Sequence, residues 1–253
     1  DLTVFLGRRP NIFKPKQLVP LPPAYRLDSP ILSLEKLAYL RTQMRHRPDL
    51  ETRTATLEID MTFPRDFGVV GFRQTLERAG KLAVEAAKNR YNILILTDRR
   101  ASSKNPPIPS LLMLRSVVEA LNKSGNRLKM SVVIDSAEIR TTHQVATLVG
   151  FGATAICPWL ALQLAGHSKH TKLSKLGAEL KQQNLIYSLE QGLLKIMSKS
   201  GIAVVRSYQS SKLFTSLGLG PLILKEYFHG LHSPFGGLEL EDICEKILKW
   251  TPD

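Results

Sequence analysis

An alternation of strand-like and helix-like segments constrains the fold of this chain more than any other feature. Residues 54–61 alternate apolar and polar side chains, which is the period of a half-buried strand. Residues 72–88 repeat their apolar positions at helical spacing, and 92–96 is a nearly continuous apolar run typical of a strand covered on both faces. The order of strand, helix and strand predicts a parallel βαβ unit.

The same alternation continues along the chain. We expect helices over 107–121 and 142–149, and strands over 131–134 and 153–156. Right-handed crossovers wind such units into a parallel sheet that is either barrel-like or open. The predicted fold class is therefore α/β, with alternating βα units forming a partial or distorted barrel-like parallel sheet.

The N-terminal segment differs from this body. Residues 2–23 contain five prolines and several basic residues, which predicts an extended arm, since proline fixes φ and lacks an N–H donor. We therefore divide the chain into an extended, basic, proline-rich arm (1–27) and an α/β domain (28–253). A helix is expected over 32–43, with Ser33 as its N-cap.

The C-terminal third is less regular. The expected elements are helices over 185–198, 212–217, 221–228 and 239–250, a strand over 202–205 and a Gly- and Pro-containing turn over 233–237.

The charge balance points to an acidic partner. There are 35 Lys and Arg residues against 22 Asp and Glu, a formal net charge of +13. Such a field attracts nucleic acid or an acidic protein, although a well-solvated surface would account for it equally well. The expected binding surface consists of Arg8, Arg9, Lys14, Lys16, Lys169, Lys172, Lys175 and Lys181.

Other compositional features narrow the class of protein. No run of 18 apolar residues occurs, so no transmembrane segment is expected and the protein should be soluble. Two cysteines cannot build a disulfide framework, which favours a reducing compartment such as the cytosol or plastid stroma. His229 and His232 lie near Cys244 without the spacing of a zinc motif, so we expect no metal.

Two polar clusters follow predicted strands. Asp98 and Arg99 end one strand, where parallel sheets gather binding residues and where turns also need charged side chains to hold loops. Asp135, Ser136 and His143 follow another strand, but a nucleophile elbow and an oxyanion-hole motif are both missing. We favour the loop-holding role and predict no catalytic residue.

Several segments carry a resemblance to a known family. They include Phe5-Leu6-Gly7-Arg8-Arg9-Pro10-Asn11-Ile12, the run from Thr142 to Ala153, and the run from Gly192 to Ile202. In these and in their order, the chain resembles the large chain of glutamate synthase, particularly its ferredoxin-dependent form. The resemblance extends over nearly the whole sequence.

The resemblance implies a function for the chain. The family makes two glutamates from glutamine and 2-oxoglutarate, with an amidotransferase domain, a central domain, a flavin and iron–sulfur domain and a C-terminal β-helix. The similar part is the central domain, which connects the catalytic domains and helps to enclose the route of ammonia. FMN and the iron–sulfur cluster belong to the neighbouring domain, so this chain is expected to hold no cofactor and, in isolation, not to catalyse glutamate synthesis.

The resemblance also identifies candidate cofactor contacts and departures from the family pattern. By resemblance alone, Lys195, Ser198, Lys199 and Gly201 are candidates for a residual anion or flavin-side contact, and a solvated basic turn is the alternative. Gln144 stands where the family usually has a histidine, and Ser210-Ser211 where it usually has glycine and alanine. These departures suggest relaxed or redirected use.

Two functions follow from these observations. The first is a non-catalytic connecting domain that is linked to glutamate biosynthesis when it is joined to catalytic domains. The second is a pseudoenzyme-like basic subunit of a larger assembly, with other protein subunits and an acidic protein or nucleic acid as partner.

Overall fold

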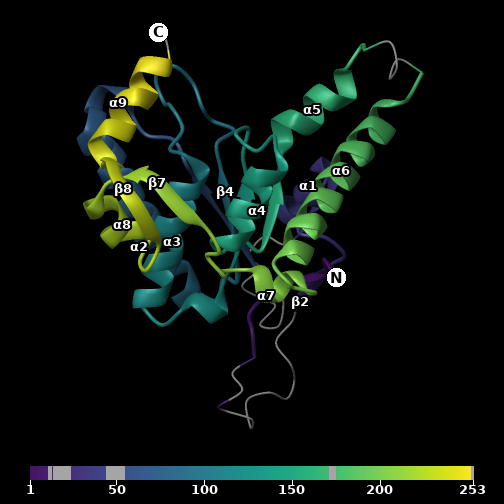
Figure 1. Cartoon of the computed structure of the whole chain (residues 1–253), viewed down its shortest axis with the longest axis horizontal. Coiled ribbons are helices and arrows are strands. Elements are labelled where there is room, and N and C mark those ends of the chain that lie inside the picture. The colour runs from purple at the N-terminus through teal and green to yellow at the C-terminus, as the bar shows by residue number, and fades with distance from the viewer. Residues whose placement is uncertain (11–12, 14–23, 44–54, 171–174, 252–253) are drawn as a thin grey trace.

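A computed structural model describes residues 1–10, 13, 24–43, 55–170 and 175–251 (Figure 1). Its centre is a four-stranded parallel sheet in the order β3 (Thr56–Asp60), β4 (Ile93–Thr97), β5 (Ser131–Asp135), β6 (Ala155–Cys157). Helices alternate with these strands, and the sheet is open rather than closed into a barrel. The predicted α/β class with a partial barrel-like parallel sheet is confirmed.

Three helices connect the strands. They are α2 (Gly68–Lys88), α3 (Ser110–Lys123) and α4 (Thr142–Gly150). Each predicted strand and helix between 54 and 156 is present, with ends that differ by a few residues. β4 and β5 are buried along their whole length, as the continuous apolar runs predicted.

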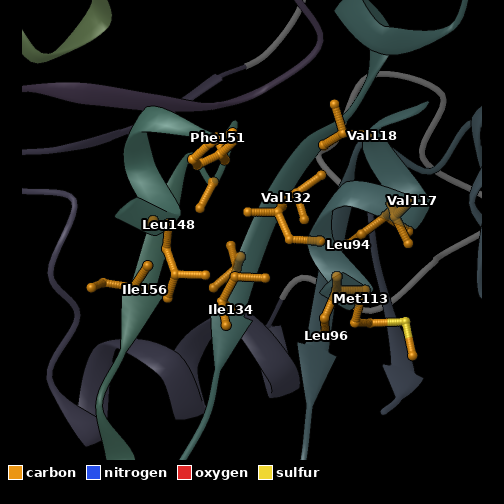
Figure 2. Packing of buried hydrophobic residues seen from close by; sticks show 14 of the residues in the cluster. Leu94, Leu96, Met113, Val117, Val118, Val132, Ile134, Leu148, Phe151 and Ile156 are labelled. Carbon is orange, nitrogen blue, oxygen red and sulfur yellow. The ribbon is translucent and has the colours of Figure 1, made fainter. Parts of the chain in front are cut away.

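The main core lies between the sheet and these helices (Figure 2). Alternate side chains of three strands, Leu94, Leu96, Val132, Ile134 and Ile156, share this layer with Met113, Val117 and Val118 of α3 and with Leu148 and Phe151 at α4. Burying one such side chain stabilises a fold by about 1.5–3 kcal/mol. This packing fixes the positions at which the strands end.

The N-terminal elements also pack against the sheet. β1 (Val4–Gly7) pairs antiparallel with β2 (Ala24–Leu27), and Gly7 N donates to Ser131 Oγ at the amino end of β5. α1 (Leu34–Gln43) begins as predicted, because Ser33 Oγ accepts a hydrogen bond from Lys36 N. The rest of the predicted arm, residues 11–12 and 14–23, lies outside the described residues.

α4 begins with a capping box that involves Gln144. Thr141 Oγ1 accepts from Gln144 N at 3.3 Å, and Gln144 Oε1 accepts from Thr141 N at 3.1 Å. Glutamine at this position therefore stabilises the start of the helix.

Two long helices form a hairpin beside the sheet. α5 (Trp159–His167) and α6 (Ala178–Lys199) pack side by side and extend away from the strands (Figure 1). α6 begins seven residues before the expected 185, and only Leu189, Leu193 and Met197 of its side chains are buried. No helix among the described residues is long and apolar enough to cross a membrane.

Three predictions in the C-terminal third are wrong. Residues 202–205 do not form a strand, because 202–204 precede the short helix α7 (Val205–Tyr208) and Val205 begins it. The range 212–217 contains the start of β7 (Thr215–Leu219) instead of a helix. The expected turn at 233–237 lies inside β8 (His232–Leu238), which pairs parallel with β7. The helices α8 (Pro221–Tyr227) and α9 (Leu240–Trp250) are confirmed.

Candidate functional site

Polar side chains converge where β4 and β5 end. The carboxyl ends of parallel strands lie at one edge of a sheet, where ligands bind in many α/β proteins. Asp98 follows β4 and Ser136 follows β5, while Thr97 and Asp135 are the register partners just before them. All four residues are buried. The structure therefore brings together parts of the two polar clusters that the sequence indicated.

Asp98 is held by three donors. Its carboxylate accepts hydrogen bonds from Ser136 Oγ at 2.6 Å, from Trp159 Nε1 at 2.7 Å and from Ala137 N at 2.8 Å. Burial nonetheless raises the pKa of Asp98, because these neutral donors only partly replace water. This carboxylate ties the ends of β4 and β5 to the start of α5.

Asp135 binds two guanidinium groups. Its side chain is completely buried and accepts from Arg99 Nε at 2.7 Å, from Arg41 Nη2 at 2.7 Å and from Thr97 Oγ1 at 2.8 Å. Arg41 also donates to Glu58 at 2.6 Å, which joins α1 to β3. The guanidinium of Arg99 lies 5.0 Å from the ring centroid of Trp159, a cation–π distance. We call Arg41, Thr97, Asp98, Arg99, Asp135, Ser136 and Trp159 the carboxyl-edge network.

The structure separates the residues of the two sequence clusters. Asp98 and Arg99 do not pair with each other: Asp98 accepts from Ser136, and Arg99 donates to Asp135. Both contact Trp159, and the loop-holding role stays a prediction. His143 is not part of it, since its ring packs edge-on against Phe214 with centroids 6.0 Å apart. Ser136 donates to Asp98 without an intervening histidine, so these residues do not form a triad.

Two members of the network were not predicted from the sequence. Arg41 and Trp159 are 94 and 61 residues from the carboxylates that they bind. Neither belongs to a motif, and only the three-dimensional structure brings them to the sheet edge.

The candidate cofactor-binding residues lie at the C-terminal end of α6. Lys195, Ser198 and Lys199 are exposed on its last turns, and Gly201 follows in the left-handed region at φ 69°. Ser198 and Gly201 line a small hollow of about 390 Å³. The C-terminal end of a helix carries partial negative charge, so the lysines rather than the backbone would have to attract an anion. A cofactor contact here stays a prediction.

The predicted basic binding surface is divided into two groups. Arg8 and Arg9 follow β1, close to α7. Lys169 and Lys175 lie between α5 and α6, and Lys181 lies in the first turn of α6. Figure 1 shows β2 and α7 near the C-terminal end of α6 and the end of α5 near its N-terminal end, and the 22 residues of α6 span about 33 Å. Lys14, Lys16 and Lys172 lie outside the described residues.

The remaining candidates are the histidines near Cys244 and the two cysteines. His229 Nδ1 lies 2.8 Å from Lys225 O, and no group of three potential metal ligands occurs in the part of the chain that the structure describes. Cys157 and Cys244 are both buried and free. Burial raises the pKa of Cys244 to about 11 and that of Cys157 further, so both thiols are protonated at neutral pH.

The fold and its carboxyl-edge network define an α/β domain built of βα repeats around an open parallel sheet. The family model of the glutamate synthase central domain matches residues 1–220, and the chain belongs to this family. The resemblance seen in the sequence is confirmed.

Curated relatives agree with this assignment. The chain is 36% identical over 268 residues to the chloroplastic ferredoxin-dependent glutamate synthase of Spinacia oleracea, covering 99% of this chain and 16% of that protein. It is 30% identical to ferredoxin-dependent glutamate synthase 2 of Synechocystis sp., and the match covers 98% of this chain and 16% of that protein. The NADPH glutamate synthase large chain of Bacillus subtilis is 32% identical, and the match covers 87% of this chain and 14% of that protein. The chain thus spans about one sixth of the length of these relatives.

Among solved structures, a mutant flavocytochrome b2 with benzoylformate matches at a TM-score of 0.44 and 14% identity. That match covers 82% of this chain and 46% of the other.

Proposed function

We propose that this chain is a non-catalytic connecting domain of a glutamate synthase type enzyme, acting in glutamate biosynthesis when it is joined to catalytic domains. The observation that carries the proposal is the carboxyl-edge network. Asp98 and Asp135 stand where an α/β sheet would present groups to a ligand, yet both bind side chains of the domain itself. This edge stabilises the scaffold.

The chemistry of the network supports a structural role. The Ser136 hydroxyl is buried and donates to the Asp98 carboxylate, which also accepts from Ala137 N and Trp159 Nε1. Serine and carboxylate are therefore held by contacts within the domain and are not presented to a substrate. The Asp135 carboxylate is buried and occupied by its contacts with Arg41, Arg99 and Thr97, so it is not presented to a substrate.

Electron transfer would be the task of another domain. A protein-bound iron–sulfur cluster normally requires four thiolates, and the sequence contains two cysteines. The resemblance to the family places FMN and an iron–sulfur cluster in a neighbouring domain of the same enzyme. We place that enzyme in the cytosol or in plastids, since one of the relatives is named as chloroplastic.

The alternative is a basic binding subunit with an acidic protein or nucleic acid partner, and the net charge of +13 favours it. A continuous basic face would support this function most strongly. The separation of the described basic residues into groups at the two ends of α6 supports the connecting domain instead.

A domain replacement tests the proposal. In the spinach relative, the segment that matches this chain is exchanged for it, and glutamate formation from glutamine and 2-oxoglutarate is measured with reduced ferredoxin. We expect the hybrid to be active, a control with a flexible linker in place of the segment to be inactive, and the chain alone to neither turn over substrate nor retain flavin. A folded but inactive hybrid, or turnover by the chain alone, would contradict the proposal.

A further inference from the structure

An arginine-lined cavity opens at the amino end of the sheet. It has a volume of about 560 Å³ and lies between the N-terminal strands, α7 and the residue that precedes β6. Its charged lining consists of Arg8, Arg9, Arg26, Arg206 and Asp1. Figure 1 shows the N-terminus, β2 and α7 close together. We call it the arginine cavity.

The positive charge of the cavity is largely unbalanced. Asp1 Oδ1 accepts a hydrogen bond from Thr3 N, and Arg26 pairs with Asp28 in an ion pair that is mostly exposed. Among the residues that the structure describes, no carboxylate lies within ion-pair distance of Arg8, Arg9 or Arg206. Three guanidinium groups at one cavity therefore lack a counter-ion from the described part of the domain.

Arg9 is held in place for binding. Its backbone N–H donates to Leu128 O, and its Nη2 donates to Gln209 Oε1 at 2.8 Å. The amide of Gln209 is fixed in turn, because its Nε2 donates to Ala153 O and Thr154 Oγ1. These contacts use one of the five guanidinium N–H donors of Arg9 and orient the others.

Neighbouring cations strengthen the field at Arg9. Burial, together with the charge of Arg206, lowers the pKa of Arg9. Behind it, Arg127 donates only to the carbonyls of Met130 and Gly152, so its charge is not neutralised by those contacts. Like charges that are partly removed from water repel one another, and an anion between them would relieve that repulsion.

The shape and chemistry of the cavity indicate the class of ligand. A guanidinium forms paired N–H···O bonds with phosphate and carboxylate groups, and the cavity volume falls in the range of small-molecule sites. Val4, Phe5 and Val204 add apolar walls that would contact a carbon skeleton. We propose that the arginine cavity binds a small organic oxyanion, a phosphate or a polycarboxylate, through Arg9 and Arg206. This site is independent of the proposed connecting function.

Calorimetric titration of the full chain with pyrophosphate and, separately, with citrate tests the site. We expect one equivalent of at least one probe to bind, and the tighter probe identifies the oxyanion. Arg206→Gln, at an exposed position of α7, should weaken binding about tenfold, as should Arg9→Gln, since each removes a charge-assisted hydrogen bond. Arg140→Gln is the matched control, because it removes one exposed arginine outside the cavity and should leave affinity within about twofold.

Three results would overturn the proposal. The first is the absence of saturable binding by both probes, and the second is an equal loss of affinity in Arg140→Gln, which would show a general charge effect. The third is tighter binding of polyglutamate that is lost in Arg206→Gln, since the occupant would then be an acidic polypeptide. Circular dichroism confirms folding, and Arg206→Gln keeps the test valid if Arg9→Gln does not fold.

Discussion

Arg99 Nε donates to Asp135 Oδ2 across 2.7 Å and thereby joins the loop after β4 to the end of β5. The side chain of Asp135 is completely buried, whereas that of Arg99 is 31% exposed. Burial of a carboxylate is unfavourable unless charged partners replace water, and Arg41 supplies the second partner from α1. The pairs therefore fix α1 and two strands at the carboxyl edge.

Asp135→Asn should strongly destabilise the domain. The neutral amide cannot balance the charges of Arg41 and Arg99. Breaking a buried ion pair costs about 3–5 kcal/mol, and we expect a loss near the lower end of that range because both arginines are partly exposed. Urea unfolding followed by circular dichroism measures the change in the free energy of unfolding. Asp28→Asn is the control, since its pair with Arg26 is exposed and should contribute less than about 1 kcal/mol. Equal effects of the two substitutions would show that the network contributes little.

Asp98 should make the stability of the domain depend on pH. Burial raises its pKa in the folded state above that in the unfolded state, so the folded protein binds the proton more tightly. The stabilisation from this group is full below the unfolded-state pKa and is lost as pH rises through the folded-state pKa.

We therefore expect the free energy of unfolding of the wild type to fall more steeply with rising pH than that of Asp98→Asn, across the window between the ordinary and the raised pKa. Urea titrations at a series of acidic pH values measure both slopes. Parallel curves would mean that Asp98 titrates alike in the folded and unfolded states.

The regular part of the fold could be predicted because its signals are local. Residues 92–96 and 131–134 are apolar runs whose length and composition suit buried parallel strands, and the helix over 72–88 repeats its apolar positions every three or four residues. β7 and β8 lack such signals. They contain three glycines, and their pairing joins residues such as Thr215 and His232 that are distant in sequence.

The carboxyl-edge network could be predicted only in part. The position of Asp98 and Asp135 after apolar strands placed them at one sheet edge, since parallel strands share their carboxyl ends. Their partners could not be inferred, because Arg41 and Trp159 reach the edge through the packing of α1 and α5, which no local pattern encodes.

Arg115 should be essential for attaching α8 to the rest of the domain. Its side chain is 1% exposed, donates to Tyr227 O at 2.9 Å and to Phe151 O at 3.1 Å, and pairs with Glu119. Arg115→Met would leave the Glu119 carboxylate and two carbonyls without this donor, which should cost about 3–5 kcal/mol.

Chemical unfolding of Arg115→Met, with Arg78→Met as the exposed control, tests this expectation. The control should change the free energy of unfolding by less than about 0.5 kcal/mol. Adding Glu119→Gln to Arg115→Met should recover part of the loss, because the unpaired charge is then removed. No recovery would show that the loss comes from packing of the long side chain rather than from its charge.

Ser210→Gly should stabilise the domain. Ser210 has φ 65°, in the left-handed region, which costs a residue with a Cβ about 1–2 kcal/mol and costs glycine little. The side chain is exposed, and the backbone bond from Ser210 N to Val149 O does not depend on it. After the greater entropy of glycine in the unfolded chain is subtracted, we expect a gain of about 0.5–1 kcal/mol in thermal or urea unfolding. Ser207→Gly, in the helical turn of α7, should instead lose about that amount, and a loss in both variants would show that the conformation of Ser210 is not strained.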